Sequence, residues 1–388
     1  MGFSFLRLWK SRGRSVWILP CFTGLTFHPV GLIFSFQSAS GGKLNPYRIN
    51  LIIACVIGIL LVGCSPRGDE HESDEFRVIM VMDMAGLGDK GFNDAGWAGV
   101  QRAVSELGIK ARYLQSNEQA DYVPNLELAA QEADAVVAMG FLMIDAVRTV
   151  ATLHPETSFI FVDGEIPGDN IASFDFKAQE GAFLAGILAA MTSKTGKVGT
   201  ILGMDIPPVR AYEVGFRAGI LTANVREGLD VEYVSATVGD FNNPSRGKAM
   251  AQGLIAQGAD VVLQLAGNTG LGVIEAVREA NGQVWAIGAD LDQDDLAAGK
   301  VLVSILKRID VAVFDAICDA KDGNLKPGHR WVGLAEGATG LSEMRHSRKD
   351  ISARALKMVD RARERIGKGK IAVPFQVEDL GRFQAPEI

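Results

Sequence analysis

Five side chains that could bind a small molecule stand where predicted strands end or a predicted helix begins. Phe92 opens a helix after a glycine-rich loop, and four others follow apolar, strand-like runs: Asp163, Phe241, Asp290 and Lys307. Each also has an ordinary interpretation as turn or cap chemistry. Together they offer two aromatic faces, carboxylates and one ammonium. Such a set suits a flat heterocycle that carries hydroxyl groups, because rings stack on phenylalanine and carboxylates accept N–H and O–H donors.

The elements that would position these residues alternate between strand and helix from Phe76 onward, pause around residues 169–177 and then alternate again. Alternation without hairpin signals predicts parallel sheets covered on both faces. Two similar α/β sets predict two doubly wound lobes with a ligand cleft at the carboxyl ends of their strands. We expect strands at 76–83, 111–115, 135–139, 158–162, 197–202, 231–237, 260–265, 283–289, 301–305 and 371–375. The expected helices cover 92–107, 122–132, 141–154, 178–192, 209–225, 244–257, 271–281, 309–321 and 348–366.

The charge of the chain is distributed unevenly. Among its 388 residues, the first 64 contain six Lys or Arg and no Asp or Glu. The rest carries 33 basic and 46 acidic residues, a net charge of −13. Such an acidic body argues against a nucleic-acid binder that relies on neutralising phosphates. Of the four cysteines, Cys318 alone lies in the body, which excludes a disulfide framework there.

Motifs for catalysis or cofactor binding are weak in this sequence. Gly86–Gly91 matches the dinucleotide fingerprint GxGxxG. However, Asp83 stands beside the loop, and the acidic residue expected about 20 positions later is missing. Ser304–Lys307 and Lys194–Gly196 match SxxK and KTG, but in the reverse order of the penicillin-recognising enzymes. Histidines and cysteines show no metal-ligand spacing. We therefore expect no cofactor, no metal and no catalytic residue.

The basic N-terminal head ends in a motif that resembles the lipobox of bacterial lipoproteins. Lys43 and Arg48 precede an apolar run, which closes with Leu61-Val62-Gly63-Cys64. The resemblance implies cleavage before Cys64 and lipid attachment to its thiol. Residues 1–63 would then be removed, and residues 64–75 would form a flexible acidic tether. An uncleaved membrane anchor or a core helix is the alternative, although the run is short for a span of about 20 residues.

The first 43 residues fit this signal poorly, since a second basic and apolar stretch stands within them. We hypothesise that translation begins near Leu44.

From Phe76 to about Phe375 the chain resembles the basic membrane protein family of substrate-binding lipoproteins, which are similar in fold to type I periplasmic binding proteins. The matching motifs are Asp89-Lys90-Gly91-Phe92-Asn93, Gln179–Gly186, Gly203–Pro207, Gly215–Gly219, Phe241–Pro244, Ala266–Gly270 and Ser304–Lys307. The resemblance implies a type I fold with a three-segment hinge. We expect residues 76–172 and 290–323 in one lobe and 173–289 and 324–388 in the other. The crossovers would lie near residues 171–176, 290–303 and 323–333.

The same resemblance assigns the predicted ligand-binding residues. It implies that the base of a purine nucleoside stacks on Phe92 and bonds to Asn93 and Asp163, with Asp83 also at the site.

For the sugar it implies that Asp290 and Lys307 bind the ribose as a pair. Phe241 and Gly267 match further cleft positions.

The resemblance implies a monomeric, non-enzymatic receptor, exported and lipid-anchored outside the cytoplasm. It would deliver guanosine, inosine or adenosine to the permease and ATPase of an ABC importer. Two alternatives stay open: the same fold binding a sugar or another small metabolite, and an exported enzyme that acts on nucleosides.

Overall fold

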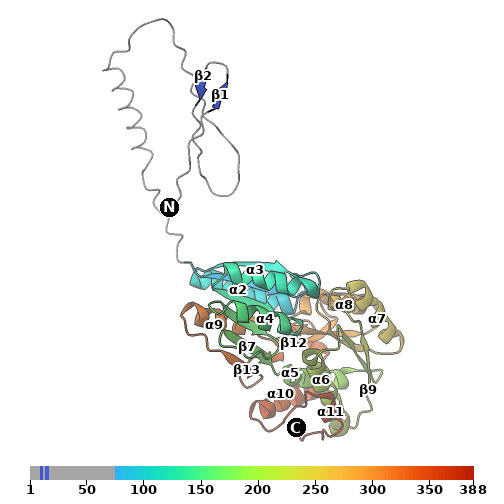
Figure 1. Cartoon of the computed structure of the whole chain (residues 1–388). Helices are drawn as coiled ribbons and strands as arrows, with labels where there is room; N and C mark the ends of the chain where they lie inside the picture. Colours follow the sequence, from blue (N-terminus) through green and yellow to red (C-terminus); the bar gives the residue numbers. More distant parts are fainter. Residues whose placement is uncertain (1–8, 12–13, 17–74) are drawn as a thin grey trace, which may run out of the picture. The chain divides into compact units, whose positions relative to one another are not determined.

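The computed structural model describes residues 9–11, 14–16 and 75–388 (Figure 1). It divides into two units, Met1–Ser73 and Asp74–Ile388. In the first unit, β1 (Trp9–Ser11) and β2 (Arg14–Val16) form a short antiparallel pair. Apart from these strands, the expected signal peptide lies outside the described residues, as do Cys64 and all of the expected tether except Glu75. Within the described part, no helix combines the length and apolarity that a membrane span requires.

The first lobe of the second unit is a parallel six-stranded sheet between two pairs of helices. The strand order is β13-β7-β6-β5-β3-β4. The strands are β3 (Arg77–Met82), β4 (Lys110–Gln115), β5 (Ala135–Met139), β6 (Ser158–Val162), β7 (Ile171–Phe176) and β13 (Gly328–Val332). One face is covered by α2 (Phe92–Leu107) and α9 (Ile309–Lys321), the other by α3 (Tyr122–Glu132) and α4 (Ile144–Leu153).

The second lobe repeats this plan with one antiparallel edge strand, in the order β14-β12-β11-β10-β8-β9. Its strands are β8 (Lys197–Leu202), β9 (Glu232–Thr237), β10 (Val261–Leu265), β11 (Trp285–Asp290), β12 (Val301–Lys307) and β14 (Thr339–Leu341). One face carries α5 (Ala178–Thr192), α6 (Pro207–Glu227) and α10 (Ala353–Gly367), and α11 (Val377–Leu380) follows near the C-terminus; the other face carries α7 (Pro244–Ala256) and α8 (Thr269–Glu279). Short 3₁₀ turns complete the unit: η1 (Gln119–Asp121), η2 (Phe141–Met143), η3 (Asp294–Ala297) and η4 (Arg348–Asp350).

The sequence pattern explains why each sheet is buried on both faces. Along β3, Val78 and Met80 point into the cluster with α2 and α9, whereas Ile79 and Val81 point into the cluster with α3 and α4. Successive strand side chains point to opposite faces, so a continuous apolar run fits a doubly covered sheet. The alternating run at 371–375 does not form the expected strand. Its buried apolar side chains pack into the second lobe instead, without backbone pairing.

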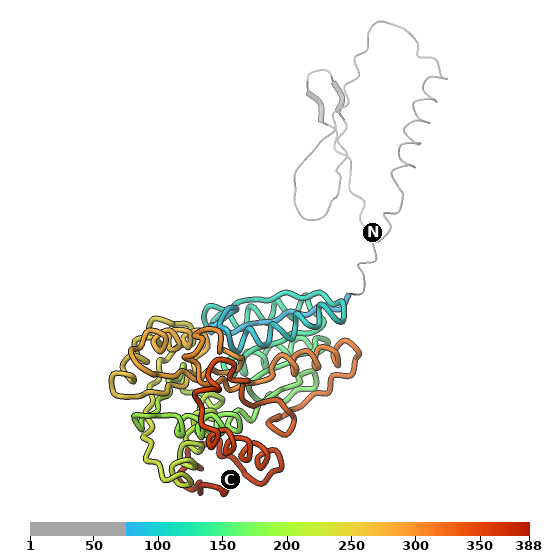
Figure 2. Tube along the Cα trace, turned by 180° about the vertical axis from the view of Figure 1, so that it is seen from behind, coloured from blue at the N-terminus to red at the C-terminus, as the bar shows by residue number. Residues whose placement is uncertain are grey.

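The chain crosses between the sheets three times, at residue 177, residue 308 and residues 333–338. This corrects the expected lobe boundaries. Residues 290–307 belong to the second lobe, because β12 pairs with β11 and β14. Residues 324–332 return to the first lobe, because β13 pairs with β7. Figure 2 shows the orange segment of α9 and β13 beside the cyan and green elements of the first lobe.

Glycines let α5 and α6 approach closely enough to bury both. A Cβ atom at Gly186 of α5 would lie 2.1 Å from the carbonyl oxygen of Phe216, and one at Gly219 of α6 would lie 2.1 Å from that of Phe183. Real Cβ atoms essentially never come this close to backbone. Two of the quoted motifs, Gln179–Gly186 and Gly215–Gly219, therefore encode a helix crossing.

A paired substitution tests this crossing. Gly186→Ala is expected to lower the free energy of unfolding by about 1–3 kcal/mol through overpacking. Gly253→Ala, in α7 with open space around it, is expected to raise it by up to about 1 kcal/mol, because alanine is the better helix former. Urea unfolding followed by circular dichroism measures both changes. A Gly186→Ala chain as stable as the wild type would show that the helices do not need this contact.

Candidate functional site

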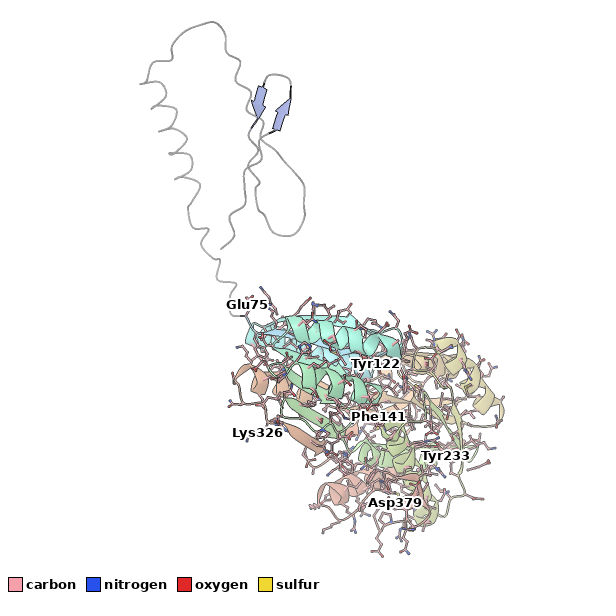
Figure 3. The ribbon with its side chains drawn as sticks, in the orientation of Figure 1. Glu75, Tyr122, Phe141, Tyr233, Lys326 and Asp379 are labelled. Carbon is pink, nitrogen blue, oxygen red and sulfur yellow. The ribbon has the colours of Figure 1, made fainter. Side chains whose placement is uncertain are left out.

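A cavity lies between the two lobes at the carboxyl ends of their strands. Its empty volume is about 660 Å³, a figure that includes space open to solvent. In Figure 3, Phe141 of its wall is seen between Tyr122 of the first lobe and Tyr233 of the second. The structure brings seven of the eight predicted ligand-binding residues to the wall of this cavity: Asp83, Phe92, Asp163, Phe241, Gly267, Asp290 and Lys307.

The loop before α2 is organised by one buried carboxylate, Asp89. Its Oδ1 accepts the backbone amides of Gly91 (3.0 Å) and Asp94 (3.2 Å), and its Oδ2 accepts that of Asn93 (2.9 Å) and the Asn93 Nδ2 (3.1 Å). These bonds shape the turn that presents Phe92 to the cavity. Burial outweighs them and raises the pKa of Asp89 to about 7. The sequence analysis contains Asp89 only as part of a motif and does not assign it this role.

Asn93 is the predicted site residue that does not line the cavity. It is fully buried, and its Nδ2 donates to Asp83 Oδ1 at 2.8 Å. Asp83 also accepts the backbone amide of Ala85 at 2.9 Å. Burial raises the pKa of Asp83, while the bond from Asn93 opposes the rise. Asn93 thus stands behind Asp83 and orients its carboxylate.

Two aspartates occupy equivalent places in the lobes, Asp163 after β6 and Asp290 at the end of β11. Both have left-handed backbone, with φ of 74° and 68°. This conformation is uncommon outside glycine, although aspartate tolerates it better than most residues. Such strain concentrates at functional sites. In both lobes it brings a carboxylate to the cavity wall.

Lys307 is a buried cation at the centre of the site. Only 2% of it is exposed, and its Nζ lies 2.5 Å from Asp163 Oδ1. The same Nζ lies 5.0, 5.2 and 5.9 Å from the ring centroids of Phe92, Phe176 and Tyr212. Lys307 ends β12 of the second lobe and Asp163 follows β6 of the first, so the ion pair spans the cleft.

Asp290 and Lys307, which we expect to bind the ribose together, both line the cavity. Asp290 Oδ1 accepts the Tyr212 hydroxyl at 2.7 Å, within the second lobe. Burial raises the pKa of Asp290, and the nearby charge of Lys307 opposes the rise. The ion pair of Lys307 with Asp163 was not expected from the sequence, because β6 and β12 end on opposite sides of one cleft and neither strand's sequence shows that they meet there.

Phe241 and Gly267 are placed by close contacts with backbone. A Cβ atom at Gly203 would lie 2.3 Å from Phe241 Cδ1, so glycine at this strand end makes room for the ring. Gly267 has φ of 54°, and a Cβ there would lie 3.3 Å from the Ala85 Cβ of the first lobe. Gly203 and Gly267 must be small, because the Phe241 ring lies against the first and the opposite lobe lies close to the second.

Besides Asp89, three polar or aromatic residues at or near the cavity were not predicted as site residues from the sequence. Phe141 follows β5 and lines the cavity, so the strand-end rule that selected Asp163 could have found it. Tyr212 lies within α6, where it is indistinguishable from a core residue. Asp175 is in β7. Burial and the charge of Asp163 raise its pKa to about 6, although the charge of Lys307 and the contact with His329 lower it.

The cavity combines aromatic faces with hydrogen-bond acceptors and one charged donor. Aromatic rings accommodate flat apolar ligands, and carboxylates accept from N–H and O–H groups. Among residues 75–388, no three His, Cys, Asp or Glu side chains are arranged to hold a metal ion. The arrangement is suited to recognising a polar, ring-containing molecule by enclosure.

Comparison with known proteins places the chain among transport receptors. The sequence model of the family described as "ABC transporter substrate-binding protein PnrA-like" matches residues 76–376. An ABC transporter nucleoside-binding protein, BmpA, of Lactococcus lactis is 32% identical over 351 residues, which cover 83% of this chain and 97% of that protein. An uncharacterized lipoprotein of Pyrococcus abyssi is 34% identical over 307 residues, covering 74% of this chain and 76% of that protein.

A solved structure supports the same placement. A solute-binding protein of an ABC transporter system from Aeropyrum pernix superimposes with a TM-score of 0.75 at 31% identity. The match covers 79% of this chain and 96% of that one. The two-lobed arrangement is therefore that of a type I solute-binding protein.

The raised pKa of Asp89 predicts a pH dependence of stability. Its folded pKa of about 7 lies above the ordinary 3.8, so between these values the folded chain binds a proton that the unfolded chain has lost. Stability must then fall as pH rises through this window. We expect the free energy of unfolding of the wild type, relative to Asp89→Asn, to fall by on the order of 1 kcal/mol per pH unit from pH 4 to 7.

Urea unfolding at several pH values measures this difference. Asp94→Asn is the matched control, because Asp94, in the first turn of α2, also accepts backbone amides of this loop. Parallel pH profiles for the wild type and Asp89→Asn would contradict the prediction.

Proposed function

The chain belongs to the PnrA-like family of ABC transporter substrate-binding proteins, and from this membership we propose that it binds a purine nucleoside between its lobes. The family and its relatives are binding proteins and not enzymes. The observation that carries the proposal is the composition of the cavity wall, in which phenylalanines of both lobes and aspartates at matched strand ends surround one buried lysine. The nucleoside-binding relative from Lactococcus lactis supports the same ligand class.

The first lobe carries the groups that we assign to the base. Phe92 offers a ring face, and offset stacking of aromatic pairs contributes about 0.5–1.5 kcal/mol beyond area burial. Asp83 and Asp163 present carboxylate oxygens, which accept the N–H groups at the edge of a purine. Asn93 keeps Asp83 oriented through its 2.8 Å bond. Inosine and guanosine carry an N–H on the six-membered ring, and adenosine carries an amino group, so each offers such a donor.

The second lobe carries the groups that we assign to the ribose. Asp290 accepts hydroxyl protons, and the Tyr212 hydroxyl fixes one of its oxygens. The ammonium of Lys307 has three hydrogens. One points to Asp163, and the others are available to ribose oxygens. We therefore propose that both residues bind the sugar, although they do not bind each other.

The charge of the wall favours nucleosides over nucleotides. The single ammonium on the cavity wall, that of Lys307, is already paired with the carboxylate of Asp163. A phosphate that entered would lose its water and lie near this carboxylate, and juxtaposed like charges cost several kcal/mol. We propose that the ligand is an uncharged nucleoside.

The three crossovers provide the hinge for ligand entry and release. Residue 177, residue 308 and residues 333–338 connect two otherwise separate sheets. A few residues at such connections absorb the backbone rotation in hinge closure. We propose that closure around the nucleoside produces the form that docks on the permease of an ABC importer, and that the receptor acts as a monomer.

We propose that the chain works outside the cytoplasm, tied to a membrane through lipid on Cys64. The support is the lipobox-like Leu61-Val62-Gly63-Cys64 and the lipoprotein from Pyrococcus abyssi among its relatives. Stable anchoring takes more than one acyl chain, since each buried methylene contributes about 0.8 kcal/mol.

A ligand panel tests the nucleoside proposal. Guanosine, inosine, adenosine, uridine and ribose are added to the full-length chain, and binding is followed by thermal shift and calorimetry, with chromatography of the ligands afterwards. We expect saturable binding of at least one purine nucleoside and no conversion. Binding of ribose with equal affinity would support a sugar receptor, and appearance of free base would support an enzyme.

Substitutions locate the binding to this cavity. Asp290→Ala is expected to weaken nucleoside binding tenfold or more, since losing a partner of a buried charged bond costs about 2–5 kcal/mol. Phe92→Ala is expected to weaken it through the loss of stacking and of buried apolar area. Asp360→Asn is the control, because Asp360 lies on α10 of the same lobe and bonds to Arg363 at the surface, outside the cavity. Calorimetry gives the three affinities. Wild-type affinity in the Asp290→Ala chain would remove Asp290 from the site.

A further inference from the structure

A buried glutamine in the second lobe reaches across the cleft to the loop that carries Phe92. Gln293 follows β11 and is only 2% exposed. Its side-chain Nε2 donates to the carbonyl oxygen of Lys90 at 2.9 Å. Lys90 belongs to the first lobe, two residues before Phe92. The bond therefore joins the two lobes at the loop that carries Phe92.

The orientation of this amide follows from a chain of hydrogen bonds that begins at backbone. The Ala266 amide, which can only donate, points to Gln264 Oε1 at 3.1 Å. Gln264 Nε2 is then the donor to Gln293 Oε1 at 2.9 Å, and the Ala289 amide donates to the same oxygen at 3.3 Å. Consequently the Nε2 of Gln293 must face Lys90.

Glycines make room for both amides. A Cβ atom at Gly288 would lie 2.7 Å from Gln293 Oε1, and one at Gly270 would lie 1.9 Å from Gln264 Oε1. Neither amide could keep its place beside a larger residue. The surroundings are thus shaped around this hydrogen-bonded pair.

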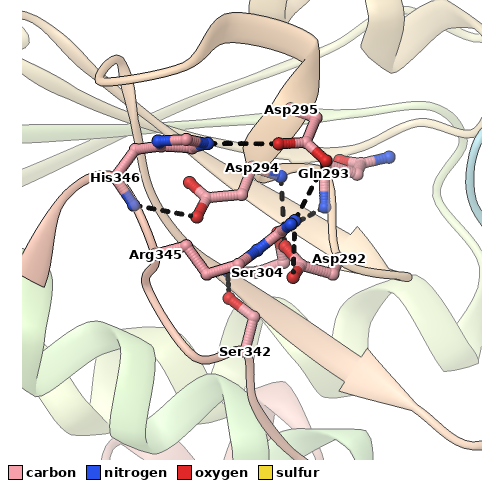
Figure 4. Close-up of polar contacts among 8 residues, drawn as sticks. All are labelled: Asp292, Gln293, Asp294, Asp295, Ser304, Ser342, Arg345 and His346. Atoms are coloured by element: carbon pink, nitrogen blue, oxygen red, sulfur yellow. Dashed lines mark hydrogen bonds and ion pairs between the residues drawn. The ribbon is translucent and has the colours of Figure 1, made fainter.

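The loop that carries Gln293 is held on both sides by the second lobe (Figure 4). The backbone amide of Gln293 donates to Ser304 Oγ at 2.9 Å, and the Ser304 amide donates to Ser342 Oγ at 2.9 Å. Arg345 bonds the flanking carboxylates of Asp292 and Asp295 at 3.3 and 3.1 Å. The side-chain amide of Gln293 therefore points toward the first lobe from a loop whose backbone is held in place.

The acceptor is also held in one conformation. Lys90 has left-handed backbone with φ of 54°, and its amide donates to Asp94 Oδ2 at 3.2 Å. The next residue, Gly91, faces the end of β11, since a Cβ there would lie 3.6 Å from the Ala289 carbonyl oxygen. A constrained carbonyl in one lobe thus meets a constrained donor in the other.

We propose that Gln293 is a positioning residue that holds the Phe92 loop against the second lobe and thereby slows the release of bound ligand. The bond joins groups on different lobes, so opening of the hinge breaks it. It consequently favours the closed form, and apparent affinity rises with the population of the binding-competent form. This inference rests on the proposed function for its ligand, but the contact can be tested without one.

Two substitutions and a matched control test this role. Gln293→Met keeps the length of the side chain and removes both the donor to Lys90 and the acceptor for Gln264 and Ala289. Gln293→Glu keeps an acceptor for Gln264 and Ala289 while removing the donor to Lys90. This variant replaces Gln293→Met in the test if the Gln293→Met protein does not fold. Ser193→Ala is the control, because it removes a bond to Asp260 that lies within the second lobe at the amino ends of the strands, away from the cleft.

Inosine affinity and stopped-flow dissociation are measured on the full-length chains, together with hydrogen exchange of residues 88–94 without ligand. We expect Gln293→Met to weaken binding about tenfold, mainly through faster dissociation, and to speed exchange in this loop. Ser193→Ala should lower the melting temperature and leave affinity and loop exchange unchanged. Wild-type dissociation and exchange in Gln293→Met, or equal effects of Ser193→Ala, would overturn the proposal. If the wild type binds no nucleoside, the proposed function fails, and the exchange experiment still decides the role of Gln293.

Discussion

The architecture of the cleft depends on keeping one ammonium group buried between two lobes. An unpaired buried charge is strongly unfavourable, so Lys307 requires partners. Asp163 supplies the direct ion pair from the opposite lobe, and the charge of Lys307 also acts on Asp175 and Asp290. Burial raises the pKa of Asp175 and of Asp290, and the charge of Asp163 raises both further, whereas the charge of Lys307 lowers them. A site of this kind favours a neutral ligand that carries its own donors.

The surrounding framework makes this burial possible. Both sheets end at the cleft, and the left-handed turns after β6 and at the end of β11 bring Asp163 and Asp290 to its wall. Glycines at strand ends and helix crossings let backbone approach backbone, as at Gly203 and Gly186. The 290s loop then contacts the first lobe through Gln293. The residues that we assign to ligand binding and the residue that contacts the opposite lobe thus lie at or just after the ends of the same strands.

The regular part of this structure was predictable from sequence, because apolar runs and helical periodicity are local signals. Phe92–Leu107 is a helix with the expected bounds. The lobe boundaries were not predictable, because the assignment of β12 and β13 depends on which distant strand each pairs with. At the site, the strand-end rule found Asp163, Asp290 and Lys307 as individuals. It did not find that Lys307 contacts Asp163 rather than Asp290, since that choice arises only when the lobes meet.

The central claim is that the buried charge of Lys307 binds the sugar of the nucleoside and joins the lobes around it. Its most direct test is the inosine affinity of the Lys307→Met chain at pH 7, measured by calorimetry beside the wild type. Methionine is similar in length and uncharged, so the substitution removes the ammonium with little change in side-chain length. The account predicts an affinity at least tenfold weaker. A dissociation constant within about twofold of the wild type would contradict it.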